Sequence, residues 1–141
     1  GGKVKTPTLA GKYSEEFNIY AGPKETLLNS INLFKTVATE NGRDEQALEI
    51  TTACPPVVGL TKESVDNSLI NAAKALIQPE DEIAKNWKER SYLYGTPEDV
   101  VKTLSMWQDV GIEAVYLQLL DLEPSKRDES VEVIRKAINL L

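Results

Sequence analysis

The sequence contains no histidine and only one cysteine, and these absences exclude several kinds of site. Without histidine there is no histidine general base, no Ser-His-Asp or Cys-His nucleophile system, and no histidine-bearing metal site. The single cysteine, Cys54, has no second cysteine in the chain and cannot build a zinc site alone. We therefore expect no metal site, interpret Cys54 as a packing residue, and expect a reducing compartment, the cytoplasm. Chemistry would have to use carboxylates, Lys, Arg, Tyr, the backbone or a cofactor, and the residue types single out no catalytic residue.

Positive charge is scarce, and long hydrophobic runs are missing. The chain has 16 Lys and Arg against 22 Asp and Glu, which gives a net charge of −6. Such a field repels phosphate backbones and anionic lipids. No apolar run approaches the roughly 20 residues that a membrane helix needs. We therefore expect neither nucleic acid nor membrane as a partner.

The chain has the length and composition of one ordinary globular domain. Its 141 residues are 41% hydrophobic and 27% charged. It begins with Gly1-Gly2, and its only methionine is Met106. We therefore expect a processed product, a tag-cleaved product or a piece of a longer protein.

The hydrophobic pattern predicts strands that alternate with helices. Short β-branched or aromatic runs predict strands near residues 17–21, 48–54 and 114–120, the last covered on both faces. Helical spacing and capping signals predict helices over about 8–16, 23–42, 62–77, 79–89, 97–111 and 124–141. Pro55-Pro56 should end the second strand and begin an irregular segment. A repeated β-then-α order indicates parallel strands with right-handed crossovers.

The sharpest local signal is the helix start at Thr96-Pro97-Glu98-Asp99. Threonine is a favoured N-cap residue, proline suits the first helical position, and Asp99 follows three residues after the cap. The acidic groups at 80–82 and 98–99 therefore fit helix first turns, where the helix dipole favours negative charge. We interpret both groups as caps and not as catalytic pairs.

Two stretches resemble a known family. GTPEDVVKTLSMWQDVGIEAVYLQLL is similar to the ending of luciferase-like flavin-dependent oxidoreductases, and GGKVKTPTLAGKYSEEFNIY is similar to a glycine pair, helix and strand that precede it. The two stretches occur in the family's order and at about its spacing. The strings GKYSEEFN and YLQLLD are closer to the deazaflavin branch, although the choice between FMN and the deazaflavin stays open.

The resemblance implies an incomplete (β/α)8 barrel. A complete barrel needs roughly 250 residues. We therefore expect an α/β fold consisting of half a TIM-type barrel, with about three parallel strands and flanking helices. Residues 1–141 would form one domain, the C-terminal half of a luciferase-like barrel. Such a half has two open strand edges, so we expect it to form a homo-oligomer or to pair with a missing N-terminal half.

The resemblance also implies a cofactor site. In similar barrels the phosphate of FMN or of the deazaflavin rests near the glycine pair and the following helix, which here means Gly1, Gly2 and Thr8. Lys3 or Lys5 would add positive charge. The alternative is that the two terminal glycines are a cloning remnant or a disordered end.

Several other residues have a functional and a structural interpretation. Tyr92 and Tyr94 fit a stacking site for the cofactor or substrate ring, or simply pack a loop onto the barrel. The polar strand residues either face the barrel interior or bond to neighbouring strands, and they are Thr51, Thr52 and Gln118. Trp87 and Trp107 lie at helical spacing with apolar residues, which favours a core or interface position.

Three functions remain open from the sequence. The first is a fragment of a flavin- or deazaflavin-dependent oxidoreductase or monooxygenase, with hydride or oxygen transfer at the cofactor ring and no activity of the chain alone. The second is a non-enzymatic half-barrel scaffold or interaction module that self-associates. The third is a separate small α/β ligand-binding domain.

Overall fold

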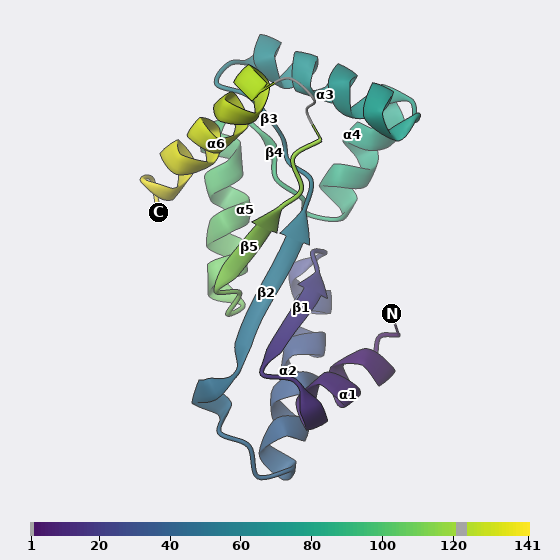
Figure 1. Ribbon diagram of the computed structural model, residues 1–141, viewed down its shortest axis with the longest axis vertical. Helices are drawn as coiled ribbons and strands as arrows, with labels where there is room; N and C mark the ends of the chain where they lie inside the picture. Colours follow the sequence, from purple (N-terminus) through teal and green to yellow (C-terminus); the bar gives the residue numbers. More distant parts are fainter. Residues whose placement is uncertain (1, 121–123) are drawn as a thin grey trace. The chain divides into compact units, whose positions relative to one another are not determined.

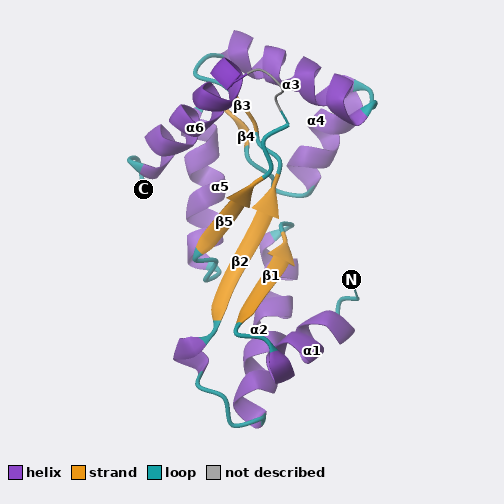
Figure 2. Ribbon diagram, viewed as in Figure 1, coloured by secondary structure: helices purple, strands orange, loops and turns teal. Residues whose placement is uncertain are grey.

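The computed structural model describes residues 2–120 and 124–141 and has an α/β architecture (Figures 1 and 2). Its longer elements follow the predicted β-then-α order. The helices are α1 (Lys5–Tyr13), α2 (Lys24–Glu40), α3 (Lys62–Leu76), α4 (Glu80–Glu89), α5 (Pro97–Asp109) and α6 (Pro124–Ile138), with a short 3-10 turn at Glu45–Ala47. The strands are β1 (Glu16–Tyr20), β2 (Glu49–Cys54), β3 (Val57–Val58), β4 (Tyr94–Gly95) and β5 (Ala114–Leu117). None of the helices in these ranges is long and apolar enough to cross a membrane.

The described residues fall into two compact units. The first unit contains the residues up to Ala53 together with Trp107–Tyr116, and the second contains Cys54–Met106 and Leu117–Leu141. The expectation that residues 1–141 form one domain stays a prediction.

The first unit is built on a three-stranded parallel sheet with the order β1-β2-β5. In Figure 1 the three arrows point the same way. The register places Glu16 opposite Glu49 and Phe17 opposite Ile50. Phe17 and Ile50 are both buried, and the Phe17 ring lies 4.9 Å from the ring of Phe34 on α2. One face of the sheet is thus covered by the apolar side of α2. The apolar surface buried between the sheet and this helix stabilises the unit.

Helix α1 packs closely against α2. Gly11 permits this approach, because a Cβ atom at its position would lie 2.6 Å from the carbonyl oxygen of Phe34 and 2.9 Å from Cβ of Val37. The guanidinium of Arg43 donates a 3.1 Å hydrogen bond to the carbonyl oxygen of Gly11 near the end of α1. Since backbone carbonyls at a helix end lack intrahelical donors, Arg43 satisfies one of them.

The opposite face of the sheet differs from the sequence prediction. The run 114–120 suggested a strand covered on both faces, but β5 ends at Leu117 and the Tyr116 side chain is 53% exposed. The prediction of double coverage is wrong for these residues. The apolar run lacks the alternation that separates a one-sided strand from a two-sided one, so the sequence did not reveal which side stays open.

The second unit contains the pair β3–β4 and most of the helices. Pro55-Pro56 ends β2 as predicted, but the next two residues form β3, which pairs in parallel with β4. A buried cluster of Val57, Ala72, Ile83 and Trp87 forms its core. The indole Nε1 of Trp87 donates a 2.7 Å hydrogen bond to the carbonyl oxygen of Pro55, so the ring has a polar partner as well as apolar neighbours.

Helix α5 begins at Pro97, as the sequence predicts. The Asp99 carboxylate accepts a long, 3.4 Å hydrogen bond from the backbone N–H of Thr96, which is the return half of a capping box. The Thr96 hydroxyl donates to the Glu98 carboxylate at 2.8 Å. Both carboxylates lie in the first turn of α5, which confirms their interpretation as helix caps.

Candidate functional site

The N-terminal end of α1 has open backbone donors. The first hydrogen bond that continues the helix joins the N–H of Thr8 to the carbonyl of Val4 at 3.1 Å, so the N–H groups of Lys5 and Thr6 have no acceptor within the helix. Val4, the N-cap residue, makes no side-chain cap, and the first turn contains no acidic residue. This end of the helix can therefore receive an anion, and Lys3 and Lys5 are exposed beside it in the sequence.

The predicted phosphate-binding residues differ in their position at this helix end. Gly2 is exposed and precedes the N-cap by two residues, whereas Gly1 lies outside the described residues. The Thr8 hydroxyl donates a 2.8 Å hydrogen bond back to the carbonyl of Val4. The donors at this end are consequently backbone amides, and Thr8 stabilises the first turn. The assignment of Gly1, Gly2 and Thr8 to a cofactor phosphate stays a prediction.

The open face of the three-stranded sheet carries a linked set of polar side chains. We call it the polar sheet face, and its residues are Glu16, Asn18, Tyr20, Glu49, Thr51 and Tyr116. The Asn18 amide donates to the Thr51 hydroxyl at 2.8 Å, and that hydroxyl donates to the Glu16 carboxylate at 2.6 Å. Thr51 thus joins the side chains of β1 and β2 while its own side chain is fully buried.

Tyr116 extends this network to the third strand. Its pKa is raised because its hydroxyl donates a hydrogen bond to the Glu16 carboxylate and because the negative charges of Glu16 and Glu49 disfavour the tyrosinate. The phenol therefore stays protonated at neutral pH and acts as a donor. A face with two carboxylates and a protonated phenol can hold polar or cationic groups.

The ends of the strands divide the polar sheet face into two parts. Glu16 and Glu49 are the first residues of β1 and β2, whereas Tyr20 is the last residue of β1. Site residues of parallel α/β folds lie at the carboxyl ends of the strands, and residues at the amino ends mainly stabilise the fold. Tyr20, with 77% of its side chain exposed, is therefore the residue of this face best placed to contact a ligand.

The site candidates predicted from the sequence did not include Glu16, Asn18, Tyr20 or Tyr116. The signal for the first three is present, because Glu16-Phe17-Asn18-Ile19-Tyr20 alternates polar and apolar residues with the period of a strand. Phe17 and Ile19 are buried on the other face, so the alternation assigns each residue to its side. The role of Tyr116 has no such signal, because its neighbours are all apolar.

The other two candidates, Thr52 on β2 and Gln118 just beyond the end of β5, are hydrogen-bonded to neighbouring backbone carbonyls. The hydroxyl of Thr52 donates to the carbonyl of Ile19 at 2.8 Å, and the N–H of Gln118 donates to the carbonyl of Cys54 at 3.0 Å. Of the three candidates, the structure gives only Thr51 a place on the polar sheet face. Cys54 is buried, and this burial raises the pKa of its thiol to about 11, which fits a packing role.

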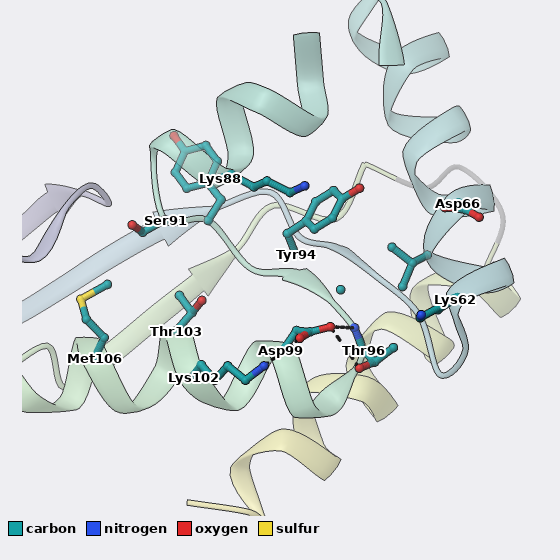
Figure 3. Close-up of a pocket in the computed structure, with 13 residues that line it drawn as sticks. Lys62, Asp66, Lys88, Ser91, Tyr94, Thr96, Asp99, Lys102, Thr103 and Met106 are labelled. Atoms are coloured by element: carbon teal, nitrogen blue, oxygen red, sulfur yellow. Dashed lines mark hydrogen bonds and ion pairs between the residues drawn. The ribbon is translucent and has the colours of Figure 1, made fainter. Parts of the chain in front are cut away.

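The second unit contains a cavity of about 630 Å³ (Figure 3). Its walls come from the start of α3, one side of α5, the end of α4 and the segment around β4. The lining residues are Lys62, Val65, Asp66, Lys88, Ser91, Tyr92, Tyr94, Gly95, Thr96, Asp99, Lys102, Thr103 and Met106. A volume of this size is typical of small-molecule sites.

The two tyrosines predicted as a stacking site both line this cavity, but their surroundings differ. The Tyr92 ring meets the ring of Trp87 edge-on, with centroids 5.4 Å apart, and so extends the core. The Nζ atom of Lys88 lies 5.4 Å from the centroid of the Tyr94 ring. Tyr94 is thus a cation-contacting wall residue, whereas Tyr92 anchors the loop.

The charges around the cavity are partly paired. The Lys102 ammonium lies 3.0 Å from the Asp99 carboxylate, and its hydrogen bond is the largest factor that lowers the pKa of Asp99. Burial raises the pKa of Tyr94, and the negative charge of Asp66 raises it further, so this hydroxyl also stays protonated. In the part of the chain that the structure describes, no group of His, Cys, Asp and Glu side chains has the arrangement of a metal site.

Both tryptophans are core residues, as the sequence predicts. Trp87 is 5% exposed in the second unit, and Trp107 is 2% exposed in the first. They differ in the hydrogen bonding of the indole nitrogen. Trp87 Nε1 bonds to Pro55, whereas Trp107 Nε1 has no hydrogen-bond partner among residues 2–120 and 124–141.

Several solved structures are similar to this chain over most of its length. An F420-dependent secondary alcohol dehydrogenase in complex with an F420-acetone adduct has a TM-score of 0.66 and 20% identity, over 93% of this chain and 45% of that one. The riboflavin lyase RcaE, with modified FMN and riboflavin, has a TM-score of 0.65 and 13% identity, over 95% of this chain and 40% of its own. The long-chain alkane monooxygenase LadA has a TM-score of 0.66 and 17% identity, over 95% of this chain and 38% of its own. No protein-family model matches the sequence, and no curated protein matches it.

The chain has the fold of part of a luciferase-like (β/α)8 barrel. It spans less than half the length of each of the three similar structures. This likeness confirms the resemblance seen in the sequence at the level of the fold, including the parallel strands and the partial barrel. The three strands of the first unit are then barrel strands, and the polar sheet face is the side that a barrel turns inward, because the helices cover the other side.

Proposed function

We propose that this chain is part of a flavin- or deazaflavin-dependent oxidoreductase, with hydride or oxygen transfer at the cofactor ring. The observation that carries the proposal is the likeness over at least 93% of the chain to an F420-dependent dehydrogenase, an FMN-containing lyase and an alkane monooxygenase. The reduced ring of such a cofactor supplies the electrons, while the protein orients the reactants and excludes water.

The N-terminal end of α1 fits the phosphate of such a cofactor. Its free amides at Lys5 and Thr6, the absence of an acidic residue in the first turn, and the nearby lysines all favour a negative charge. Gly2, without a side chain, lets a phosphate approach the backbone before the helix. Phosphate binding here would fix the position of the cofactor through backbone amides, helped by the charge of Lys3 and Lys5.

The polar sheet face supports an orienting role. Tyr20 at the carboxyl end of β1 would contact the ligand. Asn18, two residues earlier on the same strand, is held in place by its hydrogen bond to Thr51. The carboxylates at the amino ends of the strands would brace the network and not take part in the reaction. Tyr20 is thus proposed as a positioning residue for the cofactor or substrate.

We propose further that the isolated chain is inactive and that the polar sheet face is covered by another protein segment. Active sites of barrels draw on loops from all eight strands, and the first unit contains only three. An N-terminal half of such a barrel is the first candidate for the cover, and a second copy of the chain is the alternative. The exposed rings of Tyr20 and Tyr116 also favour the second candidate function, a self-associating half-barrel module without catalysis.

Two measurements on the purified chain test these proposals. Fluorescence titration with FMN and with F420 measures cofactor binding, and light scattering of the same samples measures the oligomeric state. Weak binding through the phosphate and no turnover agree with the enzyme-fragment proposal. Tight stoichiometric binding with turnover would contradict the expected inactivity. An even-numbered oligomer that binds neither cofactor would favour the non-enzymatic module.

A further inference from the structure

We propose that the cavity of the second unit binds a small planar aromatic compound that carries one phosphate or carboxylate group. The proposal does not depend on the cofactor assignment, because the cavity shares no residue with the N-terminal end of α1. It follows from three properties of the cavity: its charge, its aromatic wall and its volume.

Two of the three lysines at the cavity have no carboxylate partner within the described residues. Lys102 pairs with Asp99, whereas Lys62 and Lys88 form no ion pair with any described carboxylate. They come from the start of α3 and the end of α4, and Figure 3 shows the Lys88 side chain extending toward Tyr94. Two cations that face the same space and form no ion pair there favour an anionic ligand, although Asp66 also lines the cavity.

The wall beside these lysines suits a flat apolar body. The Tyr94 ring is half-buried and lies next to the Lys88 ammonium, and Val65 and Met106 add apolar surface. An aromatic ring stacked near Tyr94 would place its substituent within reach of Lys88. The Tyr94 hydroxyl, which stays protonated, provides a further donor.

Asp66 limits the charge of the ligand. It lies one helical turn after Lys62 on α3 and also lines the cavity. Its carboxylate would repel a second anionic group, so a single phosphate or carboxylate is favoured over a polyphosphate. The cavity volume of about 630 Å³ accommodates a compound of one or two rings.

Calorimetric titration of the full chain with phenyl phosphate, phenol and inorganic phosphate tests this inference. Phenyl phosphate should bind about tenfold tighter than either of its two parts, because it uses the ring and the charge together. Lys62→Gln and Lys88→Gln should each weaken its binding about tenfold, whereas Asp66→Asn should strengthen it. The matched control is Lys85→Gln, an exposed lysine of α4 that pairs with Glu89 and does not line the cavity.

The opposite effects of the lysine and aspartate substitutions separate a ligand site from a structural role. All four side chains are exposed, so the variants should keep the fold, and thermal unfolding of each checks this. Equal affinity for phenyl phosphate and inorganic phosphate would overturn the aromatic part of the proposal. Equal weakening by Lys85→Gln and Lys88→Gln, or no binding of phenyl phosphate, would overturn the site itself.

Discussion

The hydroxyl of Thr51 on β2 donates a 2.6 Å hydrogen bond to the carboxylate of Glu16 on β1. It connects two strands on the face of the sheet that the helices leave open. Because Thr51 also accepts from Asn18 at 2.8 Å, one hydroxyl fixes two side chains of the polar sheet face.

Replacement of Thr51 by valine should lower the free energy of unfolding by about 1 kcal/mol. The shape of the side chain is kept, but both hydrogen bonds are lost. Water can bond to Glu16 and Asn18, which are exposed, but it cannot reach the buried position of residue 51, so the bonds are replaced only in part. Urea unfolding measures the change. The control, Thr36→Val, alters an exposed threonine of α2 and should change stability by less than about 0.5 kcal/mol. Equal effects of the two substitutions would contradict the role of the network.

The two tryptophans should respond differently to replacement by phenylalanine. Both substitutions replace the indole by a smaller phenyl ring. Trp87→Phe also leaves the carbonyl of Pro55 without its donor, whereas the Nε1 atom of Trp107 has no partner among the described residues. We expect Trp87→Phe to be the more destabilising by about 1–2 kcal/mol. Chemical unfolding of each variant, followed by the fluorescence of the remaining tryptophan, gives the comparison. A larger loss for Trp107→Phe would show that the Trp87 hydrogen bond contributes little.

Substitution of Gly11 by alanine should separate α1 from α2. A methyl group there would lie 2.6 Å from the Phe34 carbonyl oxygen, a backbone atom that cannot move away easily. The expected loss of stability is roughly 1–3 kcal/mol, as for other overpacked sites. Gly22→Ala is the control, because nothing lies within 4 Å of a Cβ atom at that position. If both variants unfold at the same temperature, the close helix contact is not present in solution.

Glu16→Gln should lower the pKa of Tyr116. The substitution replaces the charged acceptor, whose hydrogen bond contributes most to the raised pKa, by a neutral and weaker amide acceptor, and it removes one of the two negative charges near the phenol. Glu49→Gln should lower it less, because Glu49 acts through its charge alone. Titration of the tyrosine Cζ resonances by NMR measures both changes, with Glu25→Gln in α2 as the control.

The pH dependence of this hydrogen bond has a definite sign. The folded-state pKa of Tyr116 lies above its unfolded value, so the bond contributes stability below about pH 10 and loses it as the pH rises through the folded pKa. An unchanged Tyr116 pKa in the Glu16→Gln variant would show that the two side chains do not meet.

Most of the fold could be predicted from the sequence, because capping residues and apolar periodicity act locally. Pro97 marks the first residue of α5, and the predicted strands near 17–21 and 48–54 agree with β1 and β2 within one residue at each end. The open face of β5 could not be predicted, since an apolar run is compatible with coverage on one face or on both. The pairing of β3 with β4 was missed as well, because two-residue strands carry too little pattern to be seen.

The candidate site was predicted less completely than the fold. The glycine pair and the following helix come from the resemblance, and the structure adds the uncapped amides that suit a phosphate. The cavity lysines lie on different elements and have no sequence signal that joins them. Tyr92 and Tyr94 were singled out together, and both line the cavity and pack against the buried cluster around Trp87. Only the structure shows that the Tyr92 ring meets Trp87 edge-on, whereas the Tyr94 ring lies beside Lys88.

The N-terminal end of α1 is proposed to receive the phosphate of a flavin or deazaflavin. Titration of the ¹⁵N-labelled chain with FMN and with riboflavin, which lacks the phosphate, tests it most directly through amide NMR shifts. We predict saturable shifts of the Lys5 and Thr6 amides with FMN, much smaller shifts with riboflavin, and weaker FMN binding by a Lys3→Gln/Lys5→Gln variant. Equal shifts with riboflavin, or FMN-induced shifts that spare these two amides, would contradict it.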